Sequence, residues 1–121
     1  MFGFVAFALL AYYAKKQVPT PVCLNAEQLQ NEIALSWETK GFGQVDGYEI
    51  FCNHINGKKV DIGFFKVGTV KNERNITIQG MAESGSYGFI VRAYRSLDSG
   101  QILYGEFSEV ATVEYTFSKS S

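Results

Sequence analysis

The 121-residue sequence predicts an all-β fold, a seven-stranded antiparallel β-sandwich preceded by a short hydrophobic N-terminal helix. Three observations support this fold class. Apolar and polar residues alternate with a period of two in several stretches after residue 21, and no later stretch keeps a 3.6-residue period. Short turn signals separate the stretches, which is typical of seven short strands arranged in two sheets.

The alternating stretches indicate which side chains face the core. The alternating apolar sets are Ile33, Leu35 and Trp37; Tyr48, Ile50 and Cys52; Ile76 and Ile78; Tyr87, Phe89, Val91 and Ala93; and Ala111, Val113 and Tyr115. From these sets we predict a structural core made of Trp37, Tyr48, Ile50, Tyr87, Phe89 and Val91.

Glycine-containing dipeptides mark the turns between these strands. Asn56-Gly57 predicts a type I′ hairpin turn that joins residues 45–55 to residues 58–70. Asp46-Gly47, Ser84-Gly85 and Ser99-Gly100 predict three further turns.

The chain divides into four parts by composition. These are an apolar anchor or plug at residues 1–16, a linker with two prolines at 17–21, the β domain at 22–116, and a Ser-rich tail at 117–121. Because proline ends helices and favours extended backbone, the linker separates the apolar segment from the domain.

The N-terminal segment is apolar on every side of a helix. Its large side chains are Phe2, Phe4, Val5, Phe7, Leu9, Leu10, Tyr12 and Tyr13. Such a helix belongs in a membrane or in a protein-lined groove. However, the run from Phe2 to Ala14 would span only about 20 Å, against a hydrocarbon core of roughly 30 Å.

Three interpretations of this segment are open. A cleaved signal peptide is disfavoured, because no basic residue precedes the apolar run and Lys15-Lys16 stand where a small-residue cleavage site is expected. A short membrane anchor would use Tyr12-Tyr13 and the two lysines as an interfacial belt. A plug in a larger assembly would use the small residues of the run to approach neighbouring helices closely. We favour the anchor or the plug.

Composition and motifs argue against several function classes. Eleven basic residues against twelve acidic ones, a net charge of −1, exclude a polybasic nucleic-acid binder. His54 is the single histidine, and next to a predicted turn it is expected to be a solvated polar residue. The cysteines, Cys23 and Cys52, lack the spacing of a zinc site, and no phosphate-binding loop is present. We therefore expect no enzyme activity, no cofactor or metal, and no small-molecule substrate.

Asn75-Ile76-Thr77 has the form of an N-glycosylation sequon. Because Asn75 starts a predicted strand, we interpret the match as a coincidence unless the protein is secreted by a eukaryote.

The order of landmarks resembles a fibronectin type III domain, an immunoglobulin-like β-sandwich, over about residues 19–116. The matching elements are Leu24, Ile33-x-Leu35-x-Trp37, Gly47-Tyr48-x-Ile50, Ile76-x-Ile78 with Met81, Ser84-Gly85-Ser86-Tyr87-x-Phe89-x-Val91-x-Ala93, and Phe107-Ser108-Glu109 before Val110–Tyr115. Met81 stands where leucine is usual, and the Met81–Gly85 turn lacks the expected proline.

The resemblance implies roles for four residues. Trp37 is expected to fill the centre of the sandwich, and the Tyr87 hydroxyl to reach a backbone group across a corner. Cys23 and Cys52 are expected on opposite sheets, Cys23 facing outward and Cys52 inward, and therefore unpaired.

Strand parity places the loops at two poles. Loops 39–46, 70–74 and 96–105 are expected at the pole of the N-terminal segment, and loops 53–58 and 80–86 at the other pole with the C-terminus. The near pole would then present Phe42, Ile102, Leu103 and Tyr104 as candidate contact residues. The alternative is that Leu103 and Tyr104 begin the last strand and are simply packed.

These observations predict a non-enzymatic structural or interaction module tethered through its N-terminus to a membrane or a multi-subunit assembly. A minor component of a virion or of a cell envelope is the expected setting. The alternative is a secreted or receptor-like adhesion domain that binds a protein or glycan through its loops after signal cleavage. Oligomeric state is not determined by the sequence.

Overall fold

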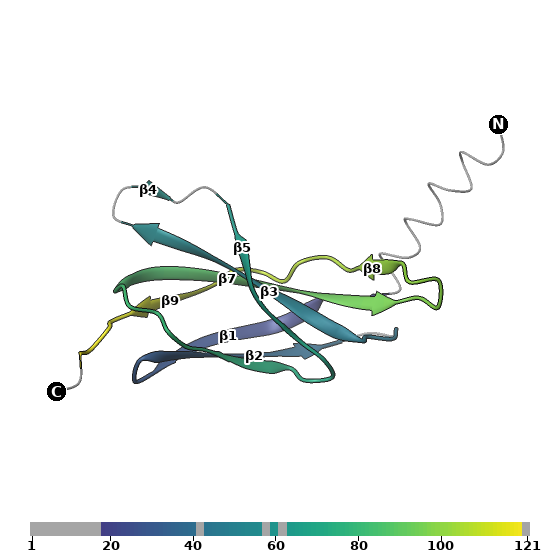
Figure 1. Ribbon diagram of the computed structural model, residues 1–121, viewed down its shortest axis with the longest axis horizontal. Coiled ribbons are helices and arrows are strands. Elements are labelled where there is room, and N and C mark those ends of the chain that lie inside the picture. Colours follow the sequence, from purple (N-terminus) through teal and green to yellow (C-terminus); the bar gives the residue numbers. More distant parts are fainter. Residues whose placement is uncertain (1–17, 41–42, 57–58, 61–62, 120–121) are drawn as a thin grey trace.

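Two antiparallel sheets pack face to face in the computed structural model, which describes residues 18–40, 43–56, 59–60 and 63–119 (Figure 1). The strands are β1 (Pro21–Leu29), β2 (Glu32–Thr39), β3 (Gly47–Asn56), β4 (Lys59–Val60), β5 (Phe65–Val70), β6 (Asn75–Ile78), β7 (Gly85–Ser96), β8 (Ile102–Tyr104) and β9 (Ala111–Tyr115). The all-β prediction is confirmed, whereas the predicted N-terminal helix lies outside the described residues.

The smaller sheet has the order β1-β2-β6, and the larger sheet is built on β3 and β7. Both β4 and β5 pair with β3, and both β8 and β9 pair with β7. The described part of the chain therefore follows seven strand paths, two of which are broken into shorter strands. This accounts for nine strands where seven were predicted.

The break between β8 and β9 has a visible cause at Ser108. Its backbone amide donates to the Val91 carbonyl, but the Val91 amide donates to the Ser108 hydroxyl in place of a backbone carbonyl. A side chain thus substitutes for one rung of the ladder, which interrupts regular pairing along β7 as a bulge does.

The predicted hairpin after β3 is confirmed in position. Ile55 pairs with Val60 and Asn56 with Lys59, so β3 runs to Asn56 itself. The turn at 57–58 lies outside the described residues.

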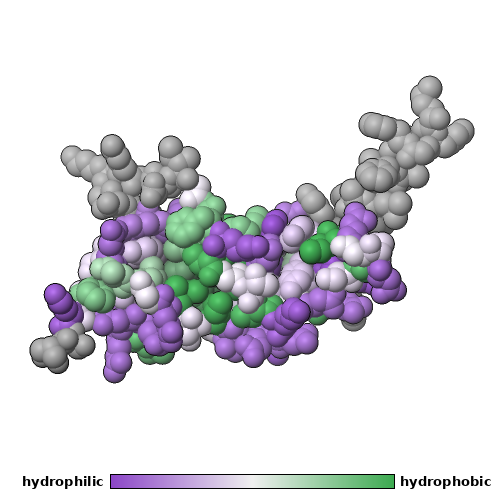
Figure 2. Space-filling view, in the orientation of Figure 1, coloured by the Kyte–Doolittle hydropathy of each residue, from purple (hydrophilic) through white to green (hydrophobic). Residues whose placement is uncertain are grey.

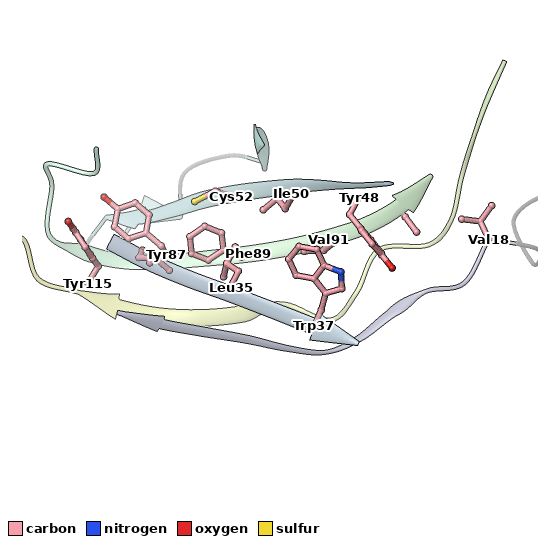
Figure 3. Close-up of a cluster of buried hydrophobic side chains, with 12 residues drawn as sticks. Val18, Leu35, Trp37, Tyr48, Ile50, Cys52, Tyr87, Phe89, Val91 and Tyr115 are labelled. Carbon is pink, nitrogen blue, oxygen red and sulfur yellow. The ribbon is translucent and has the colours of Figure 1, made fainter. Parts of the chain in front are cut away.

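The core lies between the sheets, and its side chains come from alternate positions (Figure 3). All six residues predicted for the structural core are buried: Trp37, Tyr48, Ile50, Tyr87, Phe89 and Val91. The Trp37 and Tyr48 rings meet edge to face at 5.2 Å, a favourable aromatic arrangement. Val18 lies at one end of this core and Tyr115 at the other, as Figure 3 shows.

The two-pole arrangement is confirmed for the described loops. At the near pole, the Ser96 amide donates to the Asp46 carboxylate and the Trp37 amide to the Arg74 carbonyl. At the far pole, the Phe117 amide donates to the Ser84 hydroxyl. Figure 1 shows β8 toward one end of the molecule and the C-terminus at the opposite end.

Candidate functional site

Val18, at the start of the described domain, is held in place by close packing. Val18 is only 1% exposed and packs against Gly105, which follows β8. A Cβ on Gly105 would lie 2.8 Å from the Val18 carbonyl oxygen, so only glycine allows this approach. The first described residue of the chain is therefore held in place at the near pole.

The predicted anchor lies before this point. Its eight large residues, Phe2, Phe4, Val5, Phe7, Leu9, Leu10, Tyr12 and Tyr13, are outside the described residues. Within the described ranges, no helix is long and apolar enough to span a bilayer.

The predicted contact residues have different environments. Ile102 is 43% exposed, whereas Leu103 is partly buried against the core. The Tyr104 ring is covered by the Arg92 guanidinium, whose carbon lies 3.8 Å from the ring centroid. Phe42 lies outside the described residues.

A polar and aromatic cluster on the outer face of the larger sheet was missed by the sequence analysis. Its centre is Arg92 on β7, which donates to the Glu49 carboxylate of β3 at 2.8 Å. The guanidinium also lies 5.3 Å from the Phe51 centroid and 5.0 Å from that of Phe107. Alternation in β3 and β7 places Glu49, Phe51 and Arg92 on the face opposite to the core residues. This alternation was therefore the sequence signal that could have located the cluster.

Glu49 is nearly buried within this cluster, with 10% of its side chain exposed. Lys66 on β5 donates to the same carboxylate at 3.3 Å, so two cations meet one anion. A carboxylate in such a position needs paired charges, because an unpaired buried charge is costly.

His54 does not have the solvated position that was expected. Its ring stacks on Tyr87 with centroids 4.3 Å apart, and 14% of its side chain is exposed. The expectation was wrong because His54 is directly paired with Tyr87 in the register of β3 and β7, and both side chains lie on the inward side. The Glu83 carboxylate lies 3.7 Å from the imidazole Nδ1 atom.

Tyr87 forms the corner that the resemblance implied. Its hydroxyl donates to the Glu83 carbonyl at 2.7 Å. Burial raises the pKa of this hydroxyl, and the Glu83 carboxylate raises it further. Nearby, the Tyr115 hydroxyl donates to the Met81 carbonyl at 2.7 Å, which holds the same turn from β9.

Two side-chain amides hold the segment after β9. The Gln28 amide binds both the backbone N–H and the carbonyl of Thr116, at 3.0 and 2.8 Å. The Asn31 amide binds both groups of Ser118, at 2.9 and 2.7 Å. The two amides thus bind the backbone of Thr116 and Ser118 at the positions where a neighbouring strand would.

The two cysteines have different environments. Both are unpaired, with Cys23 exposed and Cys52 buried, as the resemblance implied. Burial raises the pKa of the Cys52 thiol to about 12, so the thiol stays protonated at neutral pH. In the part of the chain that the structure describes, no group of three His, Cys, Asp or Glu residues could hold a metal ion.

Comparisons with known proteins point to one family. The model of the fibronectin type III domain matches residues 18–106. No curated protein matches the chain at a significant level. Similar solved structures include a fibronectin type III domain from the human KIAA0970 protein, with 17% identity over 93% of this chain and 85% of that chain and a TM-score of 0.66.

Two further structures extend the comparison. An Fn3-like protein from Clostridium thermocellum is 20% identical over 85% of this chain and 99% of that chain, with a TM-score of 0.58. Pectate lyase Pel3 from Pectobacterium carotovorum is 18% identical, with a TM-score of 0.54 over 79% of this chain. The present chain covers only 27% of the lyase, and at these identities the likeness concerns the fold alone.

Proposed function

Because the chain belongs to the fibronectin type III domain family, whose members are typically structural or interaction modules, we propose that it is a non-enzymatic interaction module tethered through its apolar N-terminal segment. The tether would hold the domain at a membrane or at a multi-subunit assembly. A minor component of a virion or of a cell envelope fits this proposal.

One observation supports the proposed N-terminal tether. The apolar run ends four residues before Val18, and Val18 is buried against Gly105 at the near pole. Four residues reach at most about 14 Å when fully extended, so whatever binds the run must lie close to that pole. The far pole and both outer sheet faces are then left for partners.

Partition of the full chain between water and detergent tests the tether. We expect the full chain to enter the detergent phase or to float with liposomes, and a Leu9→Arg/Leu10→Arg variant to stay in the aqueous phase. Leu29→Arg is the matched control, because Leu29 is 50% exposed on the domain and should leave partition unchanged. A full chain that stays aqueous and does not co-purify with a particle contradicts the tether.

A secreted adhesion domain is the second candidate, and one observation favours it. Asn75 and Thr77 of the sequon are both exposed on β6, while Ile76 between them packs against the core. A glycan on Asn75 is therefore compatible with the folded domain. The mass of the mature protein separates the two proposals: an intact Met1 supports the tether, and a start near Gln17 supports secretion.

A further inference from the structure

We propose that a groove along one side of the sandwich binds the protein's own residues 12–16 when no membrane or assembly holds the apolar segment. The groove lies where the edges of the two sheets meet, between the start of β1 and the stretch of chain just before β9. This docking concerns the segment in water, so it is separate from the proposed tether.

Two strand edges leave the groove open. β1 pairs only with β2, and β9 pairs only with β7. The two strands lie side by side and point the same way (Figure 3), but among the described residues no ladder of hydrogen bonds joins them. The space between residues 20–24 and residues 107–110 has a volume of about 490 Å³, which is within the range of pockets that hold ligands.

Both walls of the groove depart from regular strand geometry. The register of β1 against β2 shifts between Val22 and Asn25, and Cys23 has a left-handed φ of 56°. Such a bulge bends its strand and interrupts pairing. On the other wall, the hydroxyl of Ser108 accepts from the Val91 amide in place of a backbone carbonyl. The groove therefore forms where the two walls are both irregular.

The groove presents apolar side chains beside one carboxylate. Phe107 is 41% exposed and Val110 is 56% exposed, and Leu24 is partly buried against the core. Glu109 is the charged residue of the lining, and no ion pair joins it to another residue that the structure describes. A suitable occupant has bulky apolar side chains followed closely by a cation.

The segment that precedes Val18 begins at one end of this groove. Val18 packs against Gly105, and two residues further along each stretch of chain, Thr20 and Phe107 line the groove. Lys15 is three residues before Val18, which is at most about 11 Å along an extended chain. A turn at residue 17 would therefore bring residues 12–16 alongside the groove.

Residues 12–16 match the chemistry of the groove. Tyr12 and Tyr13 supply apolar rings, and Lys15 and Lys16 supply cations for Glu109. Residues 2–11 carry no charge and offer nothing to this carboxylate. The short connection to Val18 keeps residues 12–16 at a high effective concentration beside their own groove, which favours them over the same segment of a second copy.

Disulfide trapping tests this docking in the full chain, without detergent or lipid. Tyr13→Cys adds a thiol to the segment, while Cys23 offers an exposed thiol in the groove and Cys52 is buried. In a glutathione redox buffer we expect a disulfide between position 13 and Cys23 within one chain, because docking brings their Cα atoms within about 7 Å. Intact mass and peptide mapping identify the product. A chain that forms no such disulfide, or forms only linked dimers, overturns the proposal.

Charge exchange separates docking from the mere closeness of the two thiols along the chain. In the Tyr13→Cys protein, Glu109→Lys should lower the effective concentration of the two thiols at least about threefold, because like charges then meet in the groove. Lys15→Glu combined with Lys16→Glu should do the same. All three charge changes together should restore the original value, since opposite charges meet again.

The matched control reverses a charge on the same strand but outside the groove. Glu27 is exposed on β1, and Glu27→Lys should leave the effective concentration unchanged. Circular dichroism checks that each variant keeps its β fold. Equal values in all variants, or a combined variant that is not restored, overturn the docking. The detergent partition of the same proteins reports on the tether independently, because Leu9 and Leu10 are unchanged in all of them.

Discussion

Single hydroxyl groups hold the far pole of this sandwich. The Tyr87 hydroxyl donates to the Glu83 carbonyl, and the Tyr115 hydroxyl donates to the Met81 carbonyl in the same turn. The side chains of residues 82–84 are exposed, so this turn depends on the two tyrosines more than on its own packing.

Removing the Tyr87 hydroxyl tests this corner. We expect Tyr87→Phe to lower the free energy of unfolding by about 1 kcal/mol, because one hydrogen bond is lost while the ring stays packed. Urea denaturation measures the change. Tyr94→Phe is the control, since its hydroxyl has no hydrogen bond to any described residue; equal losses in the two variants would contradict the role of the corner.

Alkaline pH tests the burial of Cys52. The pKa of its thiol is raised in the folded state to about 12 from an ordinary value of 9.0. A raised pKa contributes stability that is complete below pH 9.0 and is lost as pH rises toward 12. We expect the free energy of unfolding to fall across this window, and to fall less steeply in Cys52→Ala. An identical slope in both proteins would exclude the thiol as the cause.

At the scale of elements, alternation along each strand accounts for which side chains face the core and which face outward. The same parity that buries Tyr48 and Ile50 turns Glu49 and Phe51 outward on β3. Figure 2 shows hydrophobic residues gathered near the middle of the visible side, with hydrophilic residues around them and toward both ends.

The amides of Gln28 and Asn31 extend the sandwich beyond its last strand. We expect Asn31→Ala to speed amide hydrogen exchange at Ser118 at least about tenfold, because the Ser118 amide loses its acceptor, the Asn31 Oδ1 atom, and the Ser118 carbonyl loses its donor. Exchange within β9 should not change. Gln44→Ala, another exposed amide, is the control; unchanged exchange at Ser118 would show that the amide does not hold the segment.

At the scale of the whole molecule, the first and the last buried core residues of the described chain lie at opposite poles of the domain. Val18 closes the core at the near pole, and Tyr115 closes it at the far pole. All strands that bury the core lie between these residues. We therefore expect the sandwich to fold without the segment that precedes Val18.

Deleting residues 1–16 tests this separation. We expect the remaining chain to give the circular dichroism of a folded, all-β protein and to unfold cooperatively, because its core residues begin at Val18. Trp37→Ala in the same shortened chain is the contrasting variant, expected to cost about 3–5 kcal/mol. An unfolded or aggregated shortened chain would show that the apolar segment belongs to the domain.

Sequence reasoning succeeded where a local pattern determines the outcome. A period of two assigns Ile33, Leu35 and Trp37 to one face whatever lies opposite. The prediction of a solvated His54 was wrong, because it was based on proximity to a turn. That proximity does not reveal the Tyr87 ring, which stacks on the imidazole from another strand. Tyr104 shows the same limit, since its partner Arg92 is brought near by the pairing of β8 with β7.

By itself, the sequence determined the positions of the strands along the chain, the inward residues, the two poles and the apolar N-terminal segment, because each depends on spacing along the chain. Only the tertiary structure decided which charges meet. The Glu49–Arg92 pair joins residues 43 positions apart, and Lys66 reaches the same carboxylate from a third strand. Hydrogen bonds and ion pairs of this kind depend on register between strands, which alternation within one strand does not specify.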